Sequence, residues 1–180
     1  MVEKINTVVL GAYFSLKPHP QFGDPHLEGV GEDGRVRQED IKYFERWYNS
    51  LKNFPIEGRV FYDNLSDNFV NKYSCEKIKF LKAKSDQYVY NVQRFFSYRD
   101  FLQKNKFDYV FFTDISDVVI ANNPTELFKK FPDTDFFLGK DSIKLFEFPY
   151  LPFHKHFNWE NYFDFFINQF NWDLINCGVI

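Results

Sequence analysis

The segment of residues 106–128, KFDYVFFTDISDVVIANNPTELF, joins an apolar stretch directly to a cluster of carboxylate and hydroxyl groups. Residues 107–113 are mostly aromatic or β-branched, which is typical of a strand buried on both faces in the middle of a parallel sheet. Asp114 and Asp117 follow this stretch, with Ser116 between them. Because ligands of open α/β sheets bind beyond the carboxyl ends of the strands, the segment predicts an α/β fold with a site at that edge.

The acidic pair has two interpretations. Asp and Ser side chains that follow a strand often bond only to nearby backbone and form a turn. Here apolar residues stand on both sides, in residues 107–113 and again in residues 118–120. Two adjacent carboxylates at such a place repel each other unless a cation or good hydrogen-bond donors lie there. We therefore expect Asp114 and Asp117 to bind a hard divalent cation.

The rest of the chain alternates between strand and helix patterns, which predicts a mostly parallel sheet flanked by helices. A loop rich in Pro and Gly, residues 17–40, separates the first strand from the first helix. The predicted strands, apart from 107–113, are residues 7–14, 58–63, 76–83, 135–139 and 172–180. The predicted helices are residues 38–53, 67–73, 88–104, 123–130 and 159–170.

Composition excludes several classes of protein. A chain of 180 residues with 44% hydrophobic and 22% aromatic residues has enough apolar surface for one folded domain. The formal charge of −3 and the lack of a Lys/Arg block argue against nucleic acid as a partner. Charges interrupt every apolar run, so we expect no membrane span, and no secretory signal stands at the start. The expected location is the cytoplasm.

The acidic motif TDISDVVI resembles the metal-binding motif of GT-A glycosyltransferases, which is usually D-x-D after an apolar strand and has a variant of the form D-x-x-D-V-V-F. Other pieces of the chain occur in the order, and roughly at the spacings, that such nucleotide-sugar transferases show. The resemblance covers nearly the whole chain and implies a single GT-A-like domain over residues 1–180. The pieces are WYNSLKNF, VFYDNLSDNF, KIKFLKA, RFFSYRDFL, PTELF, FFLGKD and WDLINCGVI.

The resemblance implies an enzyme that moves a sugar from a nucleotide-diphosphate donor, with a UDP-sugar favoured, to a glycan or other hydroxyl acceptor. It further implies that Mn²⁺ or Mg²⁺ bridges the diphosphate of the donor. The implied metal ligands are Asp114 and Asp117. The implied donor-binding residues are Tyr13, Arg94, Asp114 and Ser116, and those that contact sugar or acceptor are Asn176 and Gly178.

Three of the polar or aromatic positions have a second interpretation. Tyr13, at the end of the first strand, contacts the donor base or is simply a core residue. Arg94 binds the pyrophosphate or is a surface residue paired with a neighbour such as Asp100. Asp63, at the end of the second strand, is a second strand-end carboxylate, and of its possible roles we expect capping or turn formation.

The sequence departs from the family pattern at two places. Ser116 occupies the third position of D-x-D and the second acid comes one residue later, so the metal geometry differs from the usual one. The chain also ends at Ile180, within a predicted strand, whereas family members continue, so we expect the domain to lack its C-terminal part. No residue is assigned as catalytic base.

Two alternatives remain open. The first is a non-catalytic or truncated remnant that binds a sugar nucleotide or a glycan. The second is a phosphohydrolase of the haloacid dehalogenase type with Asp114 as nucleophile. The second is disfavoured because the nucleophile strand of those enzymes opens the fold and their second Asp lies two residues on.

Overall fold

The structure is a computed structural model that describes residues 5–17, 31–84, 88, 90–134, 139–144 and 173–176, the last two ranges as backbone only. The chain forms two compact units, Met1–Thr134 and Asp135–Ile180. The prediction of one domain over the whole chain stays a prediction. Among the described residues, no helix has both the length and the apolar character needed to cross a membrane.

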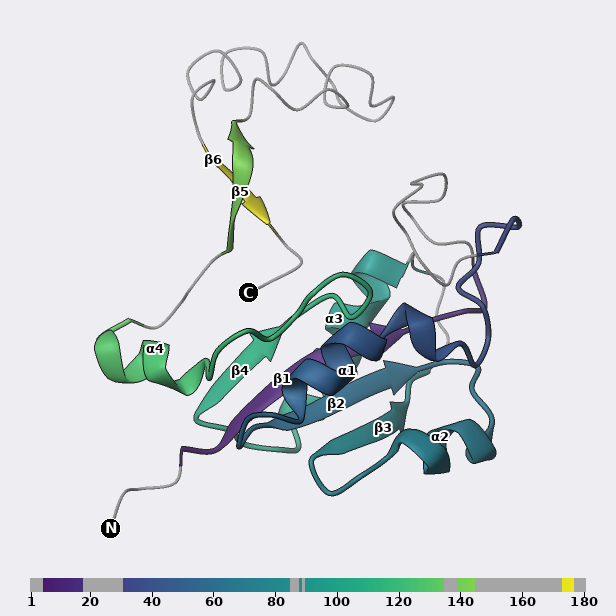
Figure 1. Cartoon of the computed structure of the whole chain (residues 1–180), viewed down its shortest axis with the longest axis horizontal. Coiled ribbons are helices and arrows are strands. Elements are labelled where there is room, and N and C mark those ends of the chain that lie inside the picture. The colour runs from purple at the N-terminus through teal and green to yellow at the C-terminus, as the bar shows by residue number, and fades with distance from the viewer. Residues whose placement is uncertain are drawn as a thin grey trace. The chain divides into compact units, whose positions relative to one another are not determined.

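The first unit contains a four-stranded parallel sheet in the order β3-β2-β1-β4 (Figure 1). This confirms the predicted α/β class with a parallel sheet. The predicted helix at residues 38–53 is shorter and divided, with a 3₁₀ helix, η1, before α1. The elements are β1 (Thr7–Tyr13), η1 (Ile41–Tyr43), α1 (Glu45–Leu51), β2 (Glu57–Tyr62), α2 (Asp67–Tyr73), β3 (Ile78–Lys82), α3 (Tyr90–Leu102), β4 (Tyr109–Phe112) and α4 (Thr125–Lys130).

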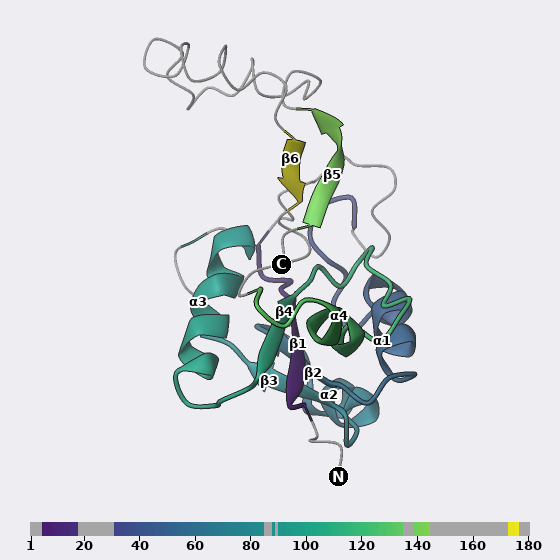
Figure 2. The ribbon, with the colours of Figure 1, turned by 90° about the vertical axis from the view of Figure 1, so that its left-hand side faces the viewer.

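Helices cover both faces of this sheet because the strand sequences are apolar on both faces. On β1, Val9 faces a core built with α1 and α2, whereas Val8 and Leu10 face a second core built with α3. Figure 2 shows α3 on one side of the sheet and α1 and α2 on the other. Among the described helices, only α3 packs on the second face of the sheet.

The core under α1 is dense and largely aromatic. Phe44 is completely buried and makes edge-on contacts with the rings of five other aromatic residues. Helix α1 also lies close to β2, since a Cβ at Gly58 would come within 2.5 Å of Leu51 Cδ2 and 3.1 Å of Trp47 Cη2. This close packing fixes α1 on the sheet.

The structure corrects the expectation that residues 107–113 lie in the middle of the sheet and are buried on both faces. Among the described residues β4 forms one edge of the sheet, and each of its four residues is only half-buried. The central, buried strand is β1. The aromatic content of β4 has another physical cause, because the rings of Tyr109 and Phe111 pack against Phe128 of α4 and Phe112 stacks on Tyr98 of α3.

The second unit contains two short antiparallel strands, β5 (Gly139–Lys144) and β6 (Asp173–Asn176), in which Gly139 pairs with Asn176. β6 confirms a strand within the predicted range 172–180. The predicted strand at 135–139 meets the structure only at its last residue, where β5 begins. The remainder of that strand and the predicted helix at 159–170 lie outside the described residues.

We predict that replacement of Phe44 by Ala lowers the free energy of unfolding by about 3–5 kcal/mol, because it removes a ring at the centre of the aromatic core. Urea denaturation monitored by circular dichroism would measure the change. The control is Val92→Ala, a residue of α3 that is 43% exposed, for which we expect a change of no more than about 0.5 kcal/mol. Equal effects of the two substitutions would contradict the described core.

Candidate functional site

The strand order places the acidic motif at the point of the sheet where ligands usually bind. The chain passes from β1 to β2 to β3 in one direction and then returns to the opposite side of β1 to form β4. The connection therefore changes direction between β1 and β4, and in open α/β sheets the ligand crevice lies beyond the carboxyl ends of the strands at such a point. Asp114, Ser116 and Asp117 follow β4 directly at this edge.

One helical turn of α1 holds the loop of residues 113–120, here called the acidic loop, near both of its ends. The indole nitrogen of Trp47 donates a buried hydrogen bond of 2.9 Å to Thr113 Oγ1. The amide of Ile120 donates one of 3.0 Å to Ser50 Oγ, whose hydroxyl in turn donates to the Trp47 carbonyl at 2.9 Å. Because α1 is packed tightly on the sheet, these bonds fix where the acidic loop starts and ends.

The middle of the acidic loop is fixed by Ile115, which is buried in the core on the α1 side. Its side chain occupies the space above Gly11 of β1, so that a Cβ at this position would overlap Ile115 Cγ2. A glycine is therefore required in the middle of the central strand. With Ile115 buried, the neighbouring Asp114 and Ser116 are half-buried and Asp117 is exposed.

Arg94 of α3 lies beside the acidic loop, where its Nη1 atom donates a hydrogen bond to Asp114 Oδ1. The Arg94 side chain is 13% exposed and that of Asp114 is 38% exposed. The alternative pairing of Arg94 with Asp100 is not seen, because Asp100 accepts two hydrogen bonds from Arg99 instead. The structure thus brings together two of the predicted donor-binding residues that are far apart in sequence.

The charges of the site perturb one another. Burial raises the pKa of the Asp114 carboxyl, Arg94 lowers it, and the nearby Asp117 carboxylate raises it further. Burial likewise raises the pKa of the Tyr43 and Tyr98 hydroxyls, and the charge of Asp114 adds to both shifts. Both tyrosines therefore stay neutral at physiological pH.

Sequence reasoning missed these two tyrosines. Tyr98 follows Arg94 by one helical turn, so helical spacing alone places it on the same side of α3. Its hydroxyl is buried and has no hydrogen-bond partner among the described residues. No sequence pattern indicated that Tyr43 lies near the site, because residues 38–53 were predicted as one regular helix.

Tyr13 and Asp63 have clear structural roles. Tyr13 is completely buried, and its hydroxyl donates to the Arg37 carbonyl at 2.6 Å and accepts from the Asp40 amide at 3.1 Å. This is the core role considered for Tyr13, and its contact with a donor base stays a prediction. The carboxylate of Asp63 accepts the amides of Ser15 and Leu16 at 2.8 and 3.1 Å, so it caps the backbone that follows β1 and does not form a turn of its own.

The two residues predicted to contact sugar or acceptor belong to the second unit. Asn176 is the last residue of β6, and its backbone pairs with Gly139. Gly178 lies outside the described residues. The roles assigned to both residues stay predictions.

A cavity of about 370 Å³ lies next to the carboxyl ends of β1 and β2. Its volume is within the range of small-molecule sites, roughly 300–1,000 Å³. Its lining residues include two arginines and one aspartate, and this net positive charge favours an anionic ligand. Its lining residues include Ser15, Leu16, Asp33, Arg35, Arg37 and Asn64.

The side chains of the acidic loop offer the oxygen ligands that a hard divalent cation prefers. Asp114, Ser116 and Asp117 all offer oxygen, and Ser116 Oγ lies 3.4 Å from Asp117 Oδ1. In the part of the chain that the structure describes, no three His, Cys, Asp or Glu side chains gather as a complete ligand set. Mg²⁺ and similar cations commonly bind through one or two carboxylates together with water and substrate phosphates, so the pair matches that mode. One Asp114 oxygen is shared with Arg94.

Comparisons of the chain with protein-family models, with curated proteins and with solved structures gave no match.

We predict that Gly11→Ala destabilises the protein by about 1–3 kcal/mol, because the new methyl group overlaps Ile115, a β-branched side chain with little rotational freedom. Ile115→Ala should cost about 2–5 kcal/mol by leaving a cavity. In the double variant the new methyl group partly fills that cavity, so the loss should be smaller than the sum of the two single losses. Denaturant unfolding of all four proteins measures this coupling, and simple additivity would contradict the contact.

A second prediction concerns the pKa of the Asp114 carboxyl. In the unmodified protein it should lie above the ordinary Asp value of about 3.9, and Arg94→Gln should raise it further by removing the opposing guanidinium. The native state then binds this proton more tightly than the unfolded state. The contribution of Asp114 to stability is therefore largest below the unfolded pKa and is lost as the pH rises through the folded pKa.

Carbon NMR titration of the Asp114 carboxyl measures the pKa directly. Arg99→Gln is the matched control, because Arg99 pairs with Asp100 and its loss should leave the Asp114 pKa unchanged. A pKa that falls or stays constant in Arg94→Gln would show that the guanidinium does not act on Asp114.

Proposed function

We propose that the chain is a metal-dependent glycosyltransferase of the GT-A type, which moves a sugar from a nucleotide-diphosphate donor, with a UDP-sugar favoured, to a hydroxyl acceptor. The observation that carries the proposal is the position of the acidic loop, which is fixed at the change of strand direction with Arg94 beside Asp114. A carboxylate pair and a guanidinium at such a crevice match a cation and a diphosphate.

In this proposal Asp114 and Asp117 hold Mn²⁺ or Mg²⁺ through carboxylate oxygens. The cation, when bound, neutralises negative charge that develops on the departing nucleoside diphosphate. Asp114 is suited to this role because it is half-buried, so its carboxylate is poorly solvated and gains from a nearby positive charge.

Arg94 has two roles in the proposal. Without donor it balances the charge of Asp114, and with donor its guanidinium also faces the diphosphate, for which its planar set of donors is well suited. Its nearly buried side chain is already ordered by α3 and by the Phe95 ring, 5.0 Å from the guanidinium carbon. Less conformational entropy is therefore lost when a phosphate binds.

The cavity with Arg35 and Arg37 lies near the same sheet edge and has the size of a small-molecule site. We assign it to the nucleoside part of the donor. Asp63 supports this wall of the site indirectly, because its carboxylate holds the backbone amides of Ser15 and Leu16 in place.

Thermal unfolding with UDP, GDP and their sugars, each with and without Mn²⁺, tests the donor site. A ligand at about a hundred times its dissociation constant stabilises the fold by roughly 2.7 kcal/mol. We expect this stabilisation with one nucleotide, only in the presence of Mn²⁺, and its loss in Asp114→Asn/Asp117→Asn. The control Glu76→Gln/Asp133→Asn removes the same charge at exposed positions and should keep the response.

Transfer of radiolabelled sugar then tests catalysis. Incorporation of label into a hydroxyl acceptor, or its release to water, supports the enzyme, whereas nucleotide binding without any turnover would favour a non-catalytic remnant. Release of phosphate from a simple phosphomonoester would favour the phosphohydrolase. Absence of any metal-dependent shift in a protein that unfolds cooperatively would contradict the donor site itself.

A further inference from the structure

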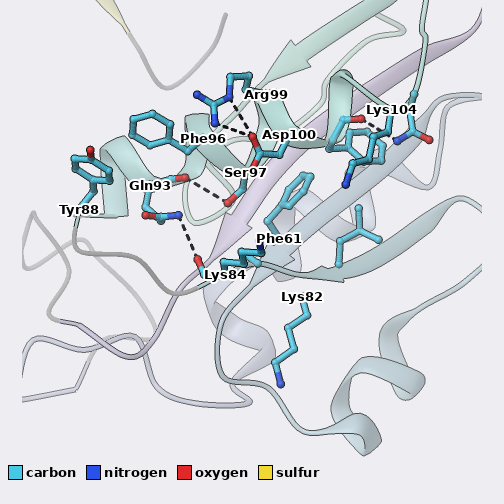
Figure 3. A pocket seen from close by; sticks show the side chains of 14 residues that line it. Phe61, Lys82, Lys84, Tyr88, Gln93, Phe96, Ser97, Arg99, Asp100 and Lys104 are labelled. Atoms are coloured by element: carbon cyan, nitrogen blue, oxygen red, sulfur yellow. Dashed lines mark hydrogen bonds and ion pairs between the residues drawn. The ribbon is translucent and has the colours of Figure 1, made fainter.

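A second cavity, of about 510 Å³, lies between α3 and the end of β3. On this face of the sheet α3 packs against β1, Phe61 of β2 and Phe112 of β4, and the cavity lies beside it at the end of β3. Figure 3 shows Phe61 of β2 between the α3 side chains and Lys82 and Lys84 of the opposite wall.

This cavity is separate from the acidic loop. Its α3 wall is formed by residues at spacings of three and four, and neither Arg94 nor Tyr98 lines it. No residue of the acidic loop lines it. The α3 residues of the wall are Gln93, Phe96, Ser97, Arg99, Asp100 and Phe101.

The residues that line the cavity are partly apolar and carry a net positive charge. Phe61, Leu81, Ala83 and Phe101 supply the apolar surface. The charged lining residues are four cations, Lys82, Lys84, Arg99 and Lys104, and one carboxylate, Asp100. This is notable in a chain whose formal charge is −3.

The single carboxylate does not balance this charge. Asp100 is already bonded to Arg99 at 2.8 and 3.1 Å. Among the described residues, none of the ion pairs includes any of the three lysines. Three lysines among the lining residues favour an anionic ligand. The volume is within the small-molecule range of roughly 300–1,000 Å³.

We propose that this cavity, the α3–β3 cavity, binds a small molecule that combines a phosphate monoester or similar dianion with an apolar ring. The ring lies on Phe61, Leu81 and Phe101, and the dianion is held by Lys82 and Lys104. Ser97 and Gln93 supply neutral polar groups on the α3 wall. The site is independent of the donor site proposed above.

The test uses 1-naphthyl phosphate as probe and the full chain labelled with nitrogen-15. In an NMR titration we expect saturable shifts at the amides of residues 82–84 and 93–104. The neutral analogue 1-naphthol and inorganic phosphate should each bind more weakly, because one lacks the dianion and the other the ring. Asp114→Asn/Asp117→Asn should bind the probe normally, which separates this site from the donor site.

The decisive variant is Lys82→Gln/Lys104→Gln, which removes the charge of two exposed side chains but keeps their polar character. We expect it to weaken binding about 10-fold or more, since charge-assisted contacts are lost. Lys42→Gln/Lys72→Gln removes the same charge at exposed positions that do not line the cavity and should bind like the unmodified protein. The proposal would be overturned if the two double variants bound the probe with equal affinity, or if 1-naphthol or phosphate bound as tightly as the probe. Shifts centred on the acidic loop, or no binding at millimolar probe, would also overturn it.

Discussion

The hydrogen bond from Trp47 to Thr113 is the contact on which the rest of the site depends. It joins α1, which is packed on β1 and β2, to the first residue after β4, and Ser50 of the same helical turn holds Ile120. Between these bonds Ile115 is buried over Gly11. The acidic loop is therefore positioned by the hydrophobic core, and its carboxylates need no fixed partners of their own to stay at the sheet edge.

The ion pair of Arg94 and Asp114 is better understood as a feature of the site than as a source of stability. Removing charges from water is costly, and ion pairs that are largely buried often stabilise a protein no better than apolar contacts do. Here the charge of the partly solvated carboxylate helps to raise the pKa of the hydroxyls of two buried tyrosines, Tyr43 and Tyr98. Such local conflicts are expected where a protein binds something.

Much of the first unit could be predicted from sequence, since strongly apolar strands and helical spacings determine element type, and α2 has the predicted bounds, Asp67–Tyr73. The proximity of Arg94 to the acidic motif was expected only through the family resemblance. The prediction that β4 lies in the middle of the sheet was wrong. Aromatic residues do not distinguish a strand covered on both faces from an edge strand that packs against helices. The roles of Gly11 and Tyr98 depend on contacts distant in sequence, which no local pattern records.

The position of Mn²⁺ on the protein can be located by paramagnetic broadening of amide NMR signals in the presence of UDP. Because broadening falls steeply with distance from the ion, it identifies the binding residues without any assumption about turnover. We expect the signals of the acidic loop, Arg94 and Ser15 to disappear first, and to persist in Asp114→Asn/Asp117→Asn. Broadening centred elsewhere, or equal broadening in that variant, would contradict the assignment of the acidic loop as the metal and donor site.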